Sequence, residues 1–293
     1  MAPSSYEGRE EDRIDRWFNR KLAYPIAVVC AKLGIHPNVV STVGMLFGVT
    51  AGWFFHYHDF AYLSIGVLLL VIATIIDNAD GMVARMTGKS SDFGYILDGL
   101  CDNFVFISIY VNGIWGIWTL PTPFGGTWGY WSLPLAVIAG VSHSFQSAML
   151  DFYKQEWRYF ATLKDDYRHK NAEEVEALRE HTTGLERLFL SIRAKHARHQ
   201  ARFARPRQEV YADLTAKRSE PGFADDYAAL NWLPMKGWFF LGPNWHIIAA
   251  CTCALLGRMD HYFWSQVLLF NAVFIATASM QARRDRLLAG GSG

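Results

Sequence analysis

Four aspartates in a largely apolar stretch are the residues of this sequence best suited to do chemistry. Asp77 and Asp80 are three residues apart, and Asp98 and Asp102 are four residues apart. At either spacing, two residues of a helix share one face. Carboxylates in apolar surroundings need a cation or a proton, because they lose their hydration there. Oxygen-only ligands favour hard ions, so these side chains predict a Mg²⁺ or Mn²⁺ site if they converge.

Convergence depends on two apolar helices, which we expect near residues 61–85 and 92–118. Each helix carries one aspartate pair at the same end. The connection between the helices is short, so they are expected to be antiparallel neighbours. The two pairs would then form one cluster of four carboxylates close to one membrane surface.

The residues around the aspartates suit a phosphate-containing substrate. Gly81 and Gly94 lack side chains, so a flat base or a diphosphate could approach the backbone beside the cluster. Arg85 is placed to meet phosphate oxygens. Two bound metal ions can stabilise both the attacking and the leaving oxygens of a phosphoryl transfer. The segment therefore predicts metal-assisted transfer of a phosphate-linked group.

The rest of the sequence predicts an all-α, integral membrane bundle of six helices. Each span must be helical, because hydrocarbon offers the backbone no hydrogen-bond partner. About 20 residues are needed to cross a bilayer, and six segments supply them: 38–57, 61–85, 92–118, 132–157, 236–257 and 262–282. The fifth segment is the weakest, since Gly242, Pro243 and Asn244 interrupt it.

A basic amphipathic segment precedes the spans. Its apolar residues recur at helical spacing with arginines and a lysine between them, namely Ile14, Trp17, Phe18 and Leu22 among Arg13, Arg16, Arg20 and Lys21. A helix of this kind lies along the lipid headgroups. We therefore expect four parts: an N-terminal interfacial helix (1–35), a transmembrane core (36–157), a charged cytoplasmic helical insertion between spans four and five (158–235), and the last two spans (236–289).

The distribution of charge predicts the orientation. The three loops expected outside the cell, 58–60, 119–131 and 258–261, carry a single Lys or Arg, Arg258. The positive-inside rule then places both termini and the aspartates in the cytoplasm, which we expect to be that of a bacterium with this chain in its inner membrane. The net charge of +1 gives no support for a nucleic-acid partner.

The pattern D-x2-D-G-x2-A-R-x8-G-x3-D-x3-D resembles the signature of the CDP-alcohol phosphotransferase family. The match holds at every fixed position: Asp77, Asp80, Gly81, Ala84, Arg85, Gly94, Asp98 and Asp102. The wider resemblance covers about residues 9–157 and 236–282 and includes His36-Pro37-Asn38 before the first span. It does not cover the insertion.

The resemblance implies a role for each matching residue. Asp77, Asp80 and Asp98 would hold two divalent cations, Mg²⁺ or Mn²⁺. Asp102 would contribute to the metal site and act as the general base that deprotonates an acceptor hydroxyl. The CDP moiety would contact six residues, with Arg85 against the diphosphate: Asn38, Asp77, Gly81, Ala84, Arg85 and Gly94. CMP would leave, and the protein would be a homodimer.

The substrates stay open between two interpretations. The first is transfer of a phosphatidyl group from CDP-diacylglycerol to a small polar acceptor such as inositol phosphate, with His143, Gln146 and Lys154 as a candidate acceptor pocket. The second is transfer of a CDP-linked headgroup, for example of phosphoinositol type, to a lipid hydroxyl such as that of ceramide or diacylglycerol. A transporter of metal ions or protons is the alternative from another class of protein, and repeats or broken helices at mid-bilayer would favour it.

Overall fold

The computed structural model describes residues 12–165, 184, 187, 191 and 208–290. Within these residues the chain is helical and contains no β-strand, apart from one isolated bridge between Pro121 and Thr127. The all-α prediction is confirmed. The middle of the insertion predicted at 158–235 lies outside the described residues.

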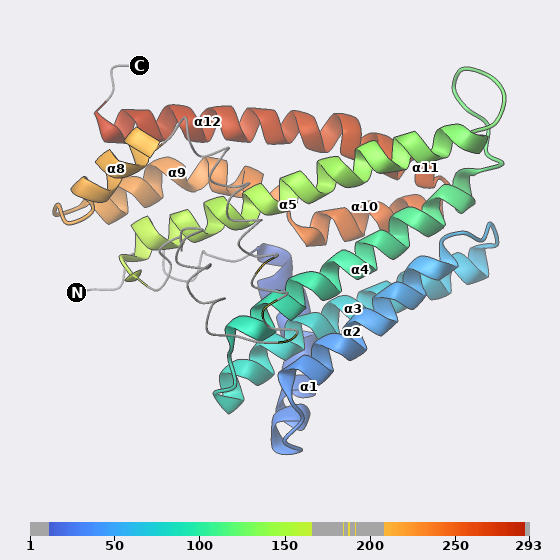
Figure 1. The fold of residues 1–293 in the computed structure, drawn as a ribbon, viewed down its shortest axis with the longest axis horizontal. Helices are drawn as coiled ribbons and strands as arrows, with labels where there is room; N and C mark the ends of the chain where they lie inside the picture. The colour runs from blue at the N-terminus through green and yellow to red at the C-terminus, as the bar shows by residue number, and fades with distance from the viewer. Residues whose placement is uncertain (1–11, 166–183, 185–186, 188–190, 192–207, 291–293) are drawn as a thin grey trace. The chain divides into compact units, whose positions relative to one another are not determined.

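Figure 1 shows the helices of the described residues in chain order. The α-helices are α1 (Arg20–Lys32), α2 (Pro37–Phe54), α3 (Phe60–Thr87), α4 (Asp92–Ile117), α5 (Ser132–Thr162), α8 (Gln208–Lys217), α9 (Phe223–Phe240), α10 (Pro243–Leu255), α11 (Met259–Ser265) and α12 (Asn271–Ala289). Shorter turns complete the order: the π-helices η1 (Asp15–Asn19) and η5 (Gln266–Phe270), and the 3₁₀-helix η2 (Gly129–Trp131).

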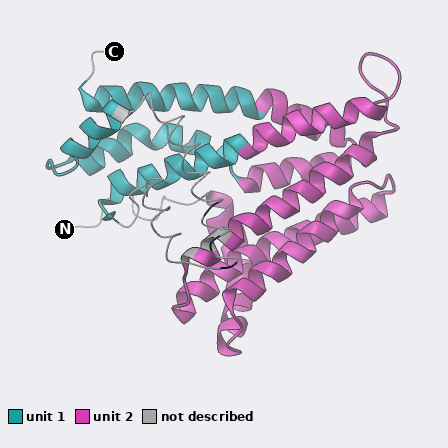
Figure 2. Ribbon diagram, viewed as in Figure 1, with its two compact units in different colours: residues 1–12, 145–242, 270–293 teal, residues 13–144, 243–269 magenta. Residues whose placement is uncertain are grey.

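The chain divides into two compact units (Figure 2). The motif unit comprises residues 13–144 and 243–269, and the second unit comprises residues 1–12, 145–242 and 270–293. The four parts expected from the sequence stay a prediction. In the second unit α12 packs against α8 and α9, so the described end of the insertion joins the last span in one body.

Four helical stretches among the described residues are long and apolar enough to cross a membrane: Phe60–Thr87, Leu97–Ile117, Gly129–Thr162 and Met259–Ala289. They support a multi-pass membrane protein, but the count of six spans is not confirmed. The expected span 236–257 is not one helix, because α9 ends at Phe240 and α10 begins at Pro243. Proline has no N–H to continue a helix, so the chain starts a new one there.

Glycines allow α2 to approach α4 closely in the motif unit. A Cβ atom at Gly48 would lie 2.5 Å from Cγ2 of Val105, and one at Gly52 would overlap Ser108. Small residues at four-residue intervals are a common means of close helix contact in membranes. Figure 1 shows α2, α3 and α4 side by side, and α2 contacts both of the others.

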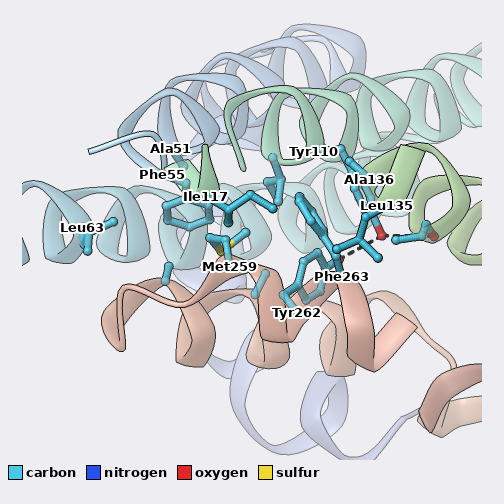
Figure 3. Packing of buried hydrophobic residues seen from close by; sticks show 14 of the residues in the cluster. Ala51, Phe55, Leu63, Tyr110, Ile117, Leu135, Ala136, Met259, Tyr262 and Phe263 are labelled. Carbon is cyan, nitrogen blue, oxygen red and sulfur yellow. Dashed lines mark hydrogen bonds between the residues drawn. The ribbon is translucent and has the colours of Figure 1, made fainter. Parts of the chain in front are cut away.

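A core of large side chains lies deeper in the motif unit (Figure 3). Phe55, Ile117, Tyr262 and Phe263 are almost fully buried there, together with Ala51 of α2. Tyr110 stacks on Phe263 with 5.5 Å between ring centroids. This packing joins α2, α4 and α11, and it holds the helices that carry the aspartates.

The N-terminal helix α1 packs on α3 through small residues. Ala23 and Ala27 are fully buried in a cluster that also includes Ala79 of the aspartate helix. The larger apolar side chains of this segment point outward, and Trp17 and Phe18 are 63% and 53% exposed. The apolar face that sequence reasoning identified is therefore available to a membrane surface, and its interfacial position stays a prediction.

Candidate metal centre

Two local signals bring the aspartate pairs together. The α3 helix ends at Thr87, where Gly88 adopts the left-handed conformation with φ of 65°. Ser91 then caps α4, because its Oγ accepts a hydrogen bond of 3.0 Å from the N–H of Gly94. Glycine at a helix end and serine at a helix start are the residues that these positions prefer. The resulting tight turn makes α3 and α4 antiparallel, as predicted.

Three of the four aspartates meet. One carboxylate oxygen from each of Asp77, Asp80 and Asp98 lies within 4.8 Å of the others. Asp80 is buried, and the other two are half-buried. Carboxylates this close repel one another unless a cation or a proton intervenes. The oxygen-only donor set suits Mg²⁺ or Mn²⁺, so this Asp triad could hold a metal ion.

A serine that the sequence analysis missed orients one member of the triad. Ser41 of α2 is buried, and its hydroxyl donates a hydrogen bond to Oδ2 of Asp80. The same hydroxyl lies 3.3 Å from the carbonyl oxygen of Pro37, one turn earlier. No sequence signal separates Ser41 from Thr42, whose hydroxyl bonds only its own helix backbone at Asn38. The packing of α2 on α3 is what selects it.

Asp102 is adjacent to Asp77 of the triad. It is one helical turn, about 5.4 Å, further along α4 than Asp98. Together with Asp77 it lines a cavity of about 140 Å³ inside the motif unit. The cavity is lined by Asp15, Gly44, Met45, Leu70, Ala73, Thr74, Asp77, Asn78, Cys101, Asp102, Val105, Phe106, Pro243, Asn244 and Ile247. Asp77 thus belongs both to the triad and to the cavity wall that carries Asp102, and the expected cluster of four carboxylates stays a prediction.

The residues expected around the CDP moiety lie in neighbouring pairs. A Cβ atom at Gly81 would be 3.5 Å from Nη1 of Arg85, and one at Gly94 would be 3.3 Å from Oδ1 of Asn38. Asn38 of α2 is therefore adjacent to the first turn of α4. Ala84 is half-buried on α3. Nucleotide binding by these residues stays a prediction.

None of the three residues expected to form an acceptor pocket lines this cavity. His143 is buried in the motif unit, 3.9 Å from His246 between ring centroids. Gln146 is buried in the second unit and donates a 2.8 Å hydrogen bond to Asn271. Lys154 is half-buried on α5 of the second unit. Polar contacts between helices account for the first two positions.

The cavity instead contains polar residues that the sequence analysis did not select. Asp15 comes from η1, Asn78 lies next to Asp77, and Asn244 is in the first turn of α10. The amide of Asn78 bonds the carbonyl oxygen of Thr74 in its own helix at 3.0 Å. Asp15 and Asn244 are 229 residues apart in the sequence, so no spacing rule could join them.

Comparisons with known proteins agree with the geometry. Residues 34–157 match the CDP-alcohol phosphatidyltransferase family. An archaetidylinositol phosphate synthase of Pyrococcus horikoshii is 34% identical over 84 residues, which are 29% of this chain and 43% of that protein. A ceramide phosphoethanolamine synthase of Drosophila melanogaster is 35% identical over 85 residues, which are 27% of this chain and 22% of that protein.

A solved structure is also similar. The crystal structure of a phosphatidylinositol phosphate synthase of Mycobacterium tuberculosis with CDP-DAG bound aligns with 84% of this chain and 94% of that chain, at 16% identity and a TM-score of 0.34. The chain spans less than half the length of the curated relatives that it matches. The residues that match the family, 34–157, contain the Asp triad, Asp102 and Arg85. Residues 34–157 of this chain therefore form a CDP-alcohol phosphatidyltransferase domain.

Proposed function

We propose that this chain transfers a substituted phosphate from a CDP-alcohol donor to the hydroxyl of an acceptor and releases CMP. The observation that carries the proposal is the Asp triad, whose carboxylate oxygens lie within 4.8 Å of one another. Two features support it: Arg85 one turn after Gly81, and a cavity beside the triad that also reaches Asp102.

The triad residues would hold two divalent cations, Mg²⁺ or Mn²⁺. When bound, these ions would stabilise the charge on the transferring phosphate and on the leaving oxygen. Ser41 keeps the Asp80 carboxylate in place through its hydrogen bond. Arg85 would neutralise diphosphate charge, and Asn38 and Gly94, which are adjacent, would contact the nucleotide.

Asp102 is proposed as the general base. A carboxylate oxygen of Asp102 takes the proton of the acceptor hydroxyl. The acceptor oxygen then forms a bond to the phosphorus of the phosphate that is transferred, which is the one bonded to the donor's alcohol. The bond from that phosphorus to the CMP oxygen breaks, and CMP leaves with the electron pair. The position of Asp102 on the cavity wall, next to Asp77, supports this role.

We propose CDP-diacylglycerol as the donor and a small polar alcohol as the acceptor, for which an inositol phosphate was the example drawn from the sequence. The similarity to an archaetidylinositol phosphate synthase supports this choice. The alternative, transfer of a CDP-linked headgroup to a lipid hydroxyl, is supported by the similarity to a ceramide phosphoethanolamine synthase. The protein would act as a homodimer in a bacterial inner membrane, with the site facing the cytoplasm.

The experiment offers each donor singly to the purified full chain in lipid nanodiscs with Mn²⁺ and a panel of acceptors. CDP-diacylglycerol, CDP-ethanolamine and CDP-inositol are the donors, and release of CMP is the readout. We expect CMP from at least one pair and none after chelation of the metal. An exposed carboxylate of the second unit supplies the control variant, Asp226→Asn, which should retain the wild-type rate.

Loss of CMP release from every pair would contradict the proposal. If Asp102→Asn then changed ion flux across vesicles made with the same protein, the transporter interpretation would replace it.

A further inference from the structure

The cavity beside the Asp triad has a polar wall made by residues outside the family signature. Asn19 of η1 is buried and donates from the same amide nitrogen to Oδ1 of Asp15 at 2.8 Å and to Oδ1 of Asn244 at 3.0 Å. An amide nitrogen carries two protons, so both bonds can exist together. Asn19 thereby positions Asp15 and the start of α10 on one cavity edge.

The charge of this cavity is negative. Among the residues that the structure describes, the charged ones that line it are Asp15, Asp77 and Asp102, with no Lys, Arg or His. A cation held by the triad would offset the charge of Asp77 but not that of Asp15, which is outside the triad. The N-terminus of α10 adds a partial positive charge of about 0.5, less than the full charge of Asp15.

The size of the cavity suits a small molecule. Its volume is about 140 Å³, and a cavity of roughly 150 Å³ accommodates benzene. A small alcohol therefore fits in it. Asp102 on the same wall can reach the hydroxyl of such a molecule.

We propose that this cavity receives the acceptor alcohol, that the acceptor is a small neutral or amino alcohol without a phosphate group, and that Asp15 selects it. This inference rests on the proposed function and narrows its acceptor. Carboxylate oxygens accept hydrogen bonds from hydroxyl or ammonium groups and repel phosphate. The inference therefore replaces inositol phosphate, the example drawn from the sequence, with an acceptor such as inositol, glycerol or ethanolamine.

The test compares acceptors that differ only by a phosphate. The full chain in nanodiscs, with Mn²⁺ and CDP-diacylglycerol, is offered myo-inositol against inositol phosphate and glycerol against glycerol 3-phosphate, with ethanolamine as the amino alcohol. We expect kcat/KM for the unphosphorylated partner to be at least tenfold higher. Asp15→Asn should raise the KM of the preferred acceptor about tenfold or more, as loss of a charged hydrogen bond does, and leave kcat and the KM of the donor unchanged.

Reversing the charge gives a second, independent variant. Asp15→Lys should move the preference toward the phosphorylated acceptor, which a purely structural role of Asp15 would not do. Size-exclusion profiles and thermal unfolding show whether each variant is folded, and Asp226→Asn should keep the wild-type preference.

Four outcomes would overturn the inference. A phosphorylated acceptor that is preferred by the wild type and by Asp15→Asn alike would refute it while leaving the proposed function intact. An equal loss of kcat for every acceptor in Asp15→Asn would reduce Asp15 to a positioning residue. CMP release only from a CDP-headgroup with a lipid alcohol would show that the cavity does not bind a small acceptor alcohol. Absence of CMP from every pair would end the proposed function itself, and this inference with it.

Discussion

The hydrogen bond from Ser41 to Asp80 permits a quantitative test of the metal centre. Ser41→Ala removes the hydroxyl that holds the Asp80 carboxylate, while all three aspartates of the triad remain in the sequence. A hydrogen bond to a charged group contributes about 1.5–3 kcal/mol. Residues that orient metal ligands typically change metal affinity about 10- to 100-fold when they are replaced. These two ranges agree, because a factor of ten corresponds to about 1.4 kcal/mol.

The expected result is specific to metal binding. Ser41→Ala should need roughly 10 to 100 times more Mn²⁺ for half-maximal CMP release, and kcat should recover toward the wild-type value when the ion is saturating. Titration of Mn²⁺ by electron paramagnetic resonance measures the same affinity without turnover. Ser64→Ala is the matched control, because within the described part of the chain the Ser64 hydroxyl bonds the carbonyl oxygen of Phe60 in its own helix and no aspartate.

An unchanged Mn²⁺ requirement in a folded Ser41→Ala protein would refute the reasoning. It would mean that Asp80 does not bind the ion or that Ser41 does not orient it. A loss of kcat that no concentration of Mn²⁺ restores would also contradict it, since the variant retains every carboxylate of the triad.

Three further predictions concern the triad, the base and the packing. Asp98→Asn removes one of the three charges that meet within 4.8 Å, so CMP release and Mn²⁺ binding should both fall at least about 100-fold, as measured by the same assays. Near wild-type turnover would rule out Asp98 as a ligand. Asp102→Asn should lower kcat by about 10²- to 10⁴-fold, the contribution typical of a general base, and this loss should persist when Mn²⁺ is saturating. Full recovery of kcat at saturating Mn²⁺ would leave Asp102 a metal ligand and remove it as the base. Gly48→Ala puts a Cβ atom 2.5 Å from Val105 and should lower the free energy of unfolding by about 1–3 kcal/mol, read as a lower midpoint of thermal unfolding in nanodiscs. A midpoint equal to that of the wild type would show that α2 and α4 are not in close contact there.

Much of the candidate site follows from local spacing. Residues three or four apart must share a helix face, so the positions of Asp77, Asp80 and Asp98 could be predicted once their segments were recognised as helices. Gly88 and Ser91 are local signals for the end of one helix and the start of the next, and they make α3 and α4 antiparallel. The break in the expected fifth span also has a local cause, since Pro243 cannot continue a helix.

The position of Asp102 shows where spacing stops being sufficient. A residue four positions from Asp98 lies on the same face but one turn deeper. Whether that turn still reaches the triad depends on how closely α3 and α4 approach each other. The structure places Asp102 on one cavity wall with Asp77. Spacing also does not show that His143 and Gln146 contact other helices, and their place in an acceptor pocket stays a prediction.

The sequence by itself determined the helical membrane architecture, the pairing of the aspartates and the family signature, because each depends on neighbours along one or two helices. Only the tertiary structure decided that Ser41 holds Asp80 and that Asn19 joins Asp15 to Asn244 at the cavity. Those contacts connect residues from separate helices, and helix packing, which no periodicity encodes, brings them together.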